Sequence, residues 1–271
     1  MSQHLRVERA GAIATVSLTG ATMPPALFAE LGAAFTALAA EPDLRVVVLR
    51  GDGKSFSYGL DLPAAFRDWG PVLTGTGPGG GLAAGRTALW GLVRELQASI
   101  TAVARCPVPV IAAIHGHCLG GGLDLASACD LRVCTADAVF SVREVRVAMV
   151  ADLGSLQRLP YIIGDAATRE LALTGRDVGA ARALALGLVS EVCADRAALD
   201  ASVAVLAADI AANPPLVVRG VKEVLGQASR GAVDAGLERV ASWNAAFLPS
   251  EDLAEAAAAF ATRRAPVYRG R

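Results

Sequence analysis

Three acidic residues, Asp124, Glu144 and Asp152, stand in apolar stretches of the sequence. An acid in apolar surroundings has a raised pKa, which suits it to proton transfer near neutral pH. Two of them also have an ordinary structural explanation, because Asp152 can cap the helix that follows it and Glu144 can be a surface residue of a strand. Together, the three acids indicate a site that moves protons.

Two glycine-containing segments follow expected strands, and in both a glycine precedes an apolar residue and an aspartate. They are "SFSYGLDL" and "GHCLGGGLDLASACD". Backbone N–H groups at a helix start are unpaired and lie in a partly positive field, and glycine lets a ligand approach them closely. A turn or tight packing explains either segment alone. Considered together, the two segments predict a pair of backbone amides that stabilises a negatively charged oxygen, such as that of an enolate.

Other common catalytic arrangements fit poorly. The segment "VVVLRGDGKS" ends like a phosphate-binding loop, but that motif needs a glycine at Val48, inside the expected strand, and a helix directly afterwards. Of the histidines, His4 is near the terminus, while His115 and His117 flank a glycine at a strand exit. We see no Ser-His-Asp arrangement and no His/Cys cluster with metal spacing, so we expect no metal site.

The elements that must position these residues alternate between strands and helices up to about residue 195, and helices follow. We expect a hairpin, a helix, a strand, a long helix and a second strand over 5–20, 25–41, 44–51, 87–107 and 108–116. This order indicates an α/β fold with an α-helical extension. The glycine-rich stretch 69–86 is expected to form a lid or loop.

Composition narrows the function classes. The net charge of −1 over 271 residues gives no sign of a nucleic-acid or anionic-membrane surface. The five cysteines form no CxxC pair and indicate buried thiols in a reducing compartment. The N-terminus lacks an apolar signal core, so we expect a cytoplasmic location. The uncharged stretch between Arg105 and Asp124 contains two prolines and a triple glycine, which argues against a membrane helix.

Three segments resemble the enoyl-CoA hydratase/isomerase family, also called the crotonase family. They are "SFSYGLDL", "PVPVIAAIHGHCLGGGLDLASACDLRV" and "FSVREVRVAMVADLGSLQRLPYIIG", and the match runs over most of the chain. The resemblance implies a spiral of repeated ββα turns over residues 1–197. It also implies a helical region over 198–271 that mediates trimers or dimers of trimers.

The family's two oxyanion-binding amides map onto Leu60 and Gly121. By resemblance, they bind a thioester carbonyl as it becomes an enolate, and coenzyme A is part of the substrate, so no separate cofactor is implied. Gly59, Gly120 and Tyr58 are expected to shape the substrate site beside these amides. The segment "FATRRAPVYRGR" resembles the family's closing segment, in which Phe260 and Arg263 are candidates for contact with the coenzyme.

The acidic residues at three positions distinguish the hydratases of the family from its dienoyl-CoA isomerases. Hydratases hold the water that they add with glutamates at positions 124 and 144, and they commonly have glycine at position 152. Here these positions are Asp124, Glu144 and Asp152, which looks like the Δ3,5-Δ2,4-dienoyl-CoA isomerases of fatty-acid β-oxidation. By resemblance, one acid removes a proton from C2 of a 3,5-dienoyl thioester and another returns a proton at C6.

We expect Glu144 to act at C2, Asp152 at C6 and Asp124 to orient the pair, with the reverse order left open. The alternative is an enoyl-CoA hydratase that uses Asp124 and Glu144 on water. A more remote alternative is a non-catalytic, RNA-binding relative, against which the net charge and the lack of a basic, aromatic-rich stripe argue.

Overall fold

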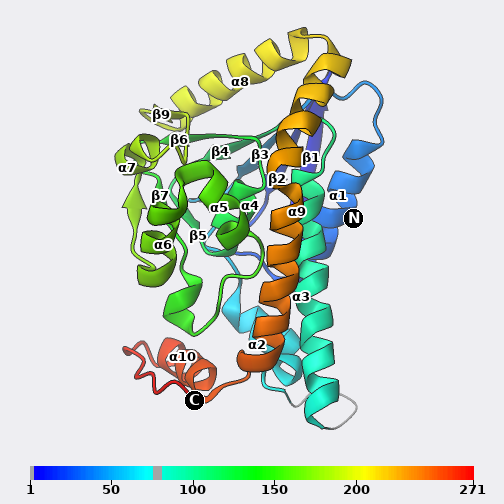
Figure 1. Ribbon diagram of the computed structural model, residues 1–271. Coiled ribbons are helices and arrows are strands. Elements are labelled where there is room, and N and C mark those ends of the chain that lie inside the picture. The colour runs from blue at the N-terminus through cyan, green and yellow to red at the C-terminus, as the bar shows by residue number, and fades with distance from the viewer. Residues whose placement is uncertain (1–2, 76–80) are drawn as a thin grey trace.

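The computed structural model describes residues 3–75 and 81–271, and Figure 1 shows a central sheet surrounded by helices. One sheet has the strand order β1 (Leu5–Ala10), β2 (Ile13–Leu18), β3 (Val46–Gly51), β4 (Val110–Ile114), β6 (Leu131–Thr135) and β9 (Glu191–Cys193). A second sheet has the order β5 (His117–Leu119), β7 (Val139–Ser141) and β8 (Val178–Gly179).

The predicted hairpin is confirmed, since β1 and β2 pair antiparallel along their whole length. From β2 to β9 the strands of the large sheet run parallel. The interior positions of β3 and β4 are almost all buried, as their nearly continuous apolar sequence predicts. Because β3 and β4 are parallel neighbours, the loops that follow Gly51 and Ile114 leave from the same edge of the sheet.

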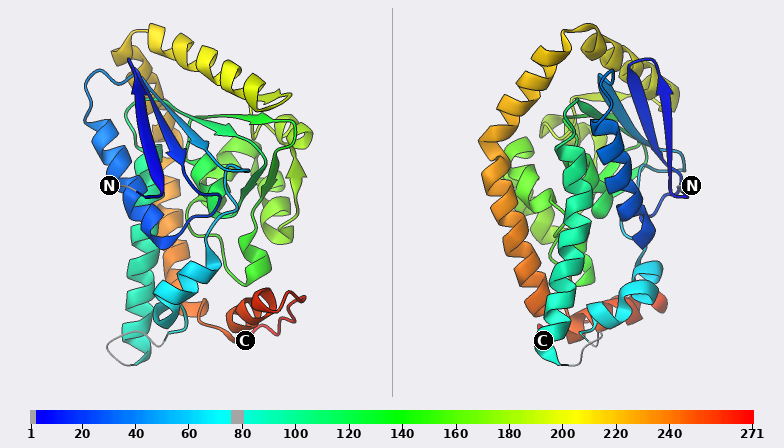
Figure 2. Two further views of the ribbon diagram at one scale, coloured as in Figure 1. Left: turned by 180° about the vertical axis from the view of Figure 1, so that it is seen from behind. Right: turned by 90° about the vertical axis from the view of Figure 1, so that its right-hand side faces the viewer.

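Helices cover both faces of the large sheet. One layer holds α1 (Pro25–Ala39), α3 (Leu82–Ala104) and α9 (Pro215–Phe247), with α3 packed against both neighbours (Figure 2). On the other face, α8 (Arg196–Ala212) packs its buried side chains on β3, β4 and β6. The expected division between residues 197 and 198 therefore falls inside α8.

The smaller helices lie around the second sheet and at the end of the chain. They are α2 (Leu62–Leu73), α4 (Gly121–Ser127), the 3₁₀ helix η1 (Glu144–Val147), α5 (Ser155–Ile163), α6 (Asp165–Thr174), α7 (Ala180–Ala185) and α10 (Glu251–Ala261). The seven residues that end the chain form an irregular tail, as expected.

The prediction of a loop or lid over residues 69–86 is wrong for most of its length. Residues 69–73 belong to α2, and 82–86 begin α3, while 76–80 lie outside the described residues. The reason is packing: apolar side chains of α2, among them Trp69 and Leu73, form a cluster with Leu89 and Val93 of α3. This burial outweighs the glycine and proline content on which the loop prediction relied.

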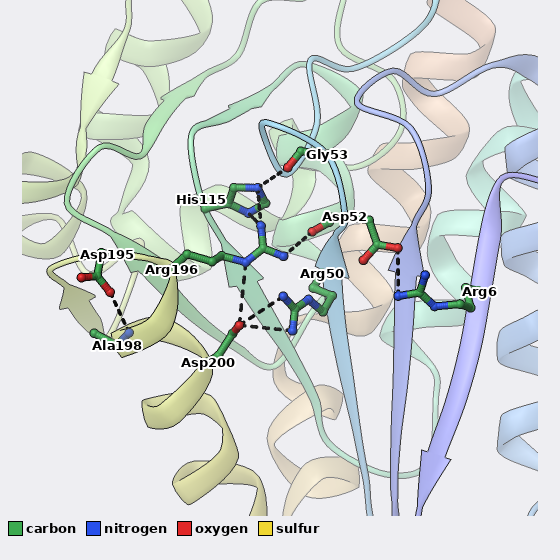
Figure 3. A network of polar contacts seen from close by, with 10 residues as sticks. Arg6, Arg50, Asp52, Gly53, His115, Asp195, Arg196, Ala198 and Asp200 are labelled. Atoms are coloured by element: carbon green, nitrogen blue, oxygen red, sulfur yellow. Dashed lines mark hydrogen bonds and ion pairs between the residues drawn. The ribbon is translucent and has the colours of Figure 1, made fainter.

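Polar contacts fasten the start of α8 to the same sheet edge (Figure 3). Arg196 donates to the carbonyl oxygen of Gly51 at 2.7 Å and contacts the ring of His115, whose Nε2 lies 2.9 Å from the Gly53 oxygen. Burial is the main cause that lowers the pKa of His115. This histidine therefore ties together the loop between β3 and α2 rather than serving as part of a triad.

In the part of the chain that the structure describes, no single helix is long and apolar enough to cross a bilayer. Only α8 and α9 together meet the length and composition criteria, with a bend of 106° between them.

Candidate active site

Backbone hydrogen bonds join the two glycine-containing loops that leave the sheet edge. Ser57 donates its N–H to the His117 oxygen at 2.9 Å, and its own oxygen accepts from Leu119 at 3.0 Å. The Ser57 hydroxyl oxygen accepts from the N–H of Gly59 at 3.0 Å. The two loops therefore run side by side, and the segment that contains Leu60 reaches the start of α4.

Gly59 allows the closest approach of the loops. Its φ is +86°, and a Cβ at this position would lie 2.7 Å from the Leu119 oxygen and 3.2 Å from the Gly121 nitrogen. The Leu60 nitrogen is 3.7 Å from where a Cβ of Gly121 would be. Within residues 3–75 and 81–271, neither the Leu60 nor the Gly121 N–H donates a hydrogen bond. The structure thus brings the two predicted amides together and leaves both available to a ligand.

Asp124, on α4, is almost fully buried at 1% exposure. Its Oδ1 accepts a hydrogen bond from the N–H of Ser155 at 2.5 Å, while its buried Oδ2 has no partner among the described residues. Burial raises the pKa of Asp124, although the Ser155 hydrogen bonds and the nearby positive charge of Arg158 oppose the shift. The Ser155 hydrogen bond therefore fixes the orientation of the Asp124 carboxyl group, which lies in the first turn of α4.

Glu144 begins η1, three residues after β7 ends, so the prediction that it lies at a strand end is off by a short turn. Its Oε1 is 3.1 Å from where a Cβ of Gly120 would be, which places the carboxyl group against the turn that precedes Gly121. Gly120 has a φ of +52°, and it leaves the room that Glu144 uses. Burial, followed by the negative charge of Asp124, raises the pKa of Glu144 well above its usual value.

Asp152 lies in the turn before α5, as predicted. Its Oδ2 accepts from the side-chain amide of Asn244 at 2.7 Å, and its backbone oxygen accepts from the amide of Gln97 at 2.7 Å. Burial raises the pKa of Asp152 to about 7, helped by the charge of Asp124 and opposed by the Asn244 hydrogen bond. This carboxyl group can therefore gain and lose a proton near neutral pH.

The three acids are close enough to perturb one another electrostatically, so they cannot all ionise independently. They lie beside a pair of free amides. An arrangement of this kind can stabilise charge on an oxygen while protons leave and arrive at neighbouring carbon atoms.

Sequence reasoning missed three polar residues that support the acids: Gln97 on α3, Asn244 on α9 and Arg158 on α5. Their side chains are buried, with exposures of 2%, 2% and 8%. For Gln97 and Asn244, the available signal was a lone side-chain amide within the apolar face of a helix, which usually has a dedicated partner. The signal indicates a contact, but it does not name the partner.

Tyr58, Phe260 and Arg263 are the remaining predicted site residues. Tyr58 is 44% exposed, and its ring stacks on that of His117 with centroids 5.1 Å apart. Phe260, on α10, lines an apolar cavity of about 280 Å³. Arg263 follows α10 with a φ of +52° and contacts none of the three acids within the described residues. The expected contacts of Phe260 and Arg263 with coenzyme A stay predictions.

The apolar cavity lies between α2, η1 with the residues after it, and α10. Side chains that line it include Leu62, Phe66, Val147, Met149, Leu253 and Phe260. Leu62 is two residues from the Leu60 amide, and Val147 ends the helix that Glu144 begins. The cavity therefore adjoins the candidate site and has the chemistry to hold a hydrocarbon.

Comparison with known proteins identifies the family. The family model described as enoyl-CoA hydratase/isomerase matches residues 8–271. The chain belongs to the enoyl-CoA hydratase/isomerase family. It is 42% identical over 265 residues to the peroxisomal Delta(3,5)-Delta(2,4)-dienoyl-CoA isomerase of Arabidopsis thaliana, covering 98% of this chain and 91% of that relative. It is 41% identical over 226 residues to the mitochondrial enzyme of that name from Homo sapiens, covering 83% and 67%.

Solved structures of the enoyl-CoA hydratase/isomerase family confirm the predicted crotonase-type fold. A crystal structure named as an enoyl-CoA hydratase from Mycobacterium avium subsp. paratuberculosis K-10 superposes with a TM-score of 0.83 at 23% identity, covering 98% of both chains. The two relatives carry peroxisomal and mitochondrial names, which give the expected cytoplasmic location no support.

Proposed function

We propose that this chain isomerises 3,5-dienoyl-CoA thioesters to 2,4-dienoyl-CoA thioesters. The observation that carries the proposal is a third carboxyl group, Asp152, which titrates near neutrality in the same site as Glu144 and the Leu60–Gly121 amide pair. Relatives named for this activity, at 41% and 42% identity, support it. The hydratase alternative needs two acids on one water and gives no role to Asp152.

In the proposed reaction, the thioester oxygen accepts hydrogen bonds from Leu60 and Gly121. The Glu144 carboxylate removes a proton from C2, and the electron pair spreads over a dienolate that runs from the thioester oxygen to C6. Asp152 then donates its proton to C6, which leaves double bonds at C2–C3 and C4–C5. We assign Glu144 to C2 because its carboxyl group lies against Gly120, next to the amide pair that holds C1. C6 is roughly 5 Å from C2 in an extended chain, so a second acid serves it.

The activity is expected to fall on both sides of a pH optimum. Because Glu144 and Asp152 interact, their protons leave in steps that belong to the pair, and the active form holds one proton between them. At low pH the second proton neutralises Glu144. As the pH rises above the Asp152 value of about 7, the pair loses its last proton and kcat/KM falls. A profile of kcat/KM that is flat from pH 6 to 9 would contradict this assignment.

The apolar cavity is proposed to take the acyl tail. Each buried methylene contributes about 0.8 kcal/mol, so kcat/KM should rise about fourfold per added methylene until the cavity is full. Ala257→Phe fills part of the cavity and should reduce kcat/KM for long tails at least tenfold while leaving short tails almost unchanged. Ala258→Phe, on the exposed side of α10, is the matched control. Equal effects of the two variants across a tail-length series would exclude the cavity as the tail site.

An ultraviolet assay tests the proposed function. Incubation with a 3,5-dienoyl-CoA should produce the longer-wavelength absorbance of a conjugated dienoyl thioester. In parallel, a 2-enoyl-CoA should keep its absorbance, because hydration would remove it. Loss of the enoyl absorbance without any diene signal would favour the hydratase alternative.

Self-association as a trimer or a dimer of trimers is also proposed. The amino-terminal half of α9 exposes apolar side chains, namely Leu216, Val217, Val221, Val224 and Leu225. Burial against other copies would remove these side chains from water. Sedimentation as a single 27.6 kDa particle would contradict this proposal. For the compartment, the five buried free thiols support one that keeps cysteines reduced.

A further inference from the structure

Asn244, on α9, contacts the turn that carries Asp152. Its Nδ2 donates to the Asp152 carboxyl oxygen Oδ2 at 2.7 Å and to the Val150 backbone oxygen at 2.9 Å. The side chain is 2% exposed, so water does not compete for these hydrogen bonds. The Val150 oxygen can only accept, which fixes the orientation of the amide: its NH₂ group faces Asp152.

This orientation has a consequence for the acid. An amide NH₂ group directed at Oδ2 favours protonation of the other carboxyl oxygen, because the carbonyl oxygen of a carboxylic acid accepts a hydrogen bond more strongly than its hydroxyl oxygen. When Asp152 is protonated, its proton therefore resides on Oδ1. Of the two carboxyl oxygens, Oδ1 is then the one that can deliver a proton to a substrate.

Gln97, on α3, holds the same turn in a different way. Its Nε2 donates to the backbone oxygen of Asp152 at 2.7 Å and to that of Leu237 at 3.0 Å, and its Oε1 accepts from Arg94 at 2.8 Å. It is as buried as Asn244. Gln97 thus positions the backbone of residue 152, whereas Asn244 acts on the carboxyl group itself.

We propose that Asn244 is a positioning residue for the isomerisation, which reserves Oδ1 of Asp152 for proton exchange at C6 by occupying Oδ2. This inference rests on the function proposed above. It assigns a role in the chemistry to α9, which the family resemblance linked to subunit contacts.

The charged and titratable groups around this contact belong to several elements. Asp124 and Glu144 interact with Asp152 through their charges, and Arg158 with Asp124. Arg94 of α3 is paired with Glu238 of α9 at 3.5 Å, on the outer side of Gln97. Other charged residues nearby in the chain include Glu95 on α3, Arg105 directly after α3, and Asp234 and Arg239 on α9. Among the described residues, Asn244 is the only side chain that donates a hydrogen bond to the Asp152 carboxyl group.

The test compares Asn244→Leu with Gln97→Leu. Asn244→Leu removes a hydrogen bond that stabilises the Asp152 carboxylate, so its proton is held more tightly and the alkaline limb of kcat/KM should move to higher pH by at least half a unit. We expect kcat to fall tenfold to a hundredfold, with a smaller change in KM. Gln97→Leu should leave the position of the alkaline limb unchanged, whatever it does to the rate.

A second readout separates the two proton transfers. In deuterium oxide, Asn244→Leu should still exchange the C2 proton of the substrate while product formation falls. If circular dichroism shows that the Asn244→Leu variant does not fold, Asn244→Ser provides the same comparison with a smaller side chain. The inference is overturned if the Asn244 variants keep the wild-type kcat and the wild-type position of the alkaline limb of the kcat/KM profile. It is also overturned if Gln97→Leu shifts that alkaline limb by the same amount. If the wild-type protein does not isomerise dienes at all, the proposed function itself is ruled out.

Discussion

Asp152→Asn is expected to lower kcat for diene isomerisation by about a thousandfold or more and, at the same time, to make the folded protein more stable. The activity falls because an amide cannot return a proton to C6, and a positioned general acid contributes 10²–10⁴-fold to rate as an order of magnitude. The substituted side chain keeps an oxygen that accepts from Asn244, so the local structure is retained.

The gain in stability has a definite pH dependence. The pKa of Asp152 is raised from 3.8 to about 7 in the folded state, so the folded state binds its proton more tightly than the unfolded state does. Stability from this group is complete below pH 3.8 and is lost as the pH rises through about 7, a loss of up to about 4 kcal/mol. The asparagine removes that loss. Thermal unfolding should show a higher Tm than wild type at pH 8 and a much smaller difference at pH 5.

Asp165→Asn is a suitable control, because Asp165 is an exposed residue at the start of α6 with no contact to the site. It should change neither kcat nor the pH dependence of Tm by a comparable amount. Full isomerase activity of the Asp152 variant, or a lower Tm at pH 8, would contradict the position that we give to this acid.

The second large effect is expected at the amide pair. In Gly59→Ala, the new methyl group would lie 2.7 Å from the Leu119 oxygen, at a φ of +86° that alanine rarely adopts. The two loops must then separate, which moves the Leu60 amide away from Gly121. Loss of one donor to an oxyanion lowers kcat by about 10²–10³-fold, and we expect that range here.

Gly91→Ala gives the matched control for this substitution. Gly91 lies inside α3, and nothing is within 4 Å of a Cβ at that position. The control should keep its activity and gain about 1 kcal/mol from the better helix propensity of alanine. If Gly59→Ala retained wild-type kcat in a folded protein, the amide pair would not be the group that stabilises the enolate.

Much of this site was predictable from local sequence. The buried strands β3 and β4 are nearly continuous apolar runs, and parallel neighbours release their loops at one edge. For that reason the two glycine-containing segments after these strands predicted a pair of neighbouring amides, and the family resemblance assigned the pair to Leu60 and Gly121. Asp124 follows Gly121 by less than one helical turn, so its position beneath the amides also came from the sequence.

The supports of Asp152 were not predictable in the same way. Asn244 is 92 residues away along the chain and Gln97 is 55 residues away. Each contact depends on how α9 and α3 cross, and no local pattern encodes that. The same limit explains the wrong loop over 69–86, because the contacts that make it helical come from the packing of α2 on α3.

Hydrogen exchange in deuterium oxide tests the division of labour between the two acids most directly. Substrate is incubated with Asp152→Asn or with Glu144→Gln, and deuterium at C2 is followed by mass spectrometry. Asp152→Asn should label C2 of the substrate without forming the 2,4-diene, because Glu144 and the amide pair still make the dienolate, while Glu144→Gln should do neither. Labelling at C2 by Glu144→Gln but not by Asp152→Asn would contradict the assignment of Glu144 to C2.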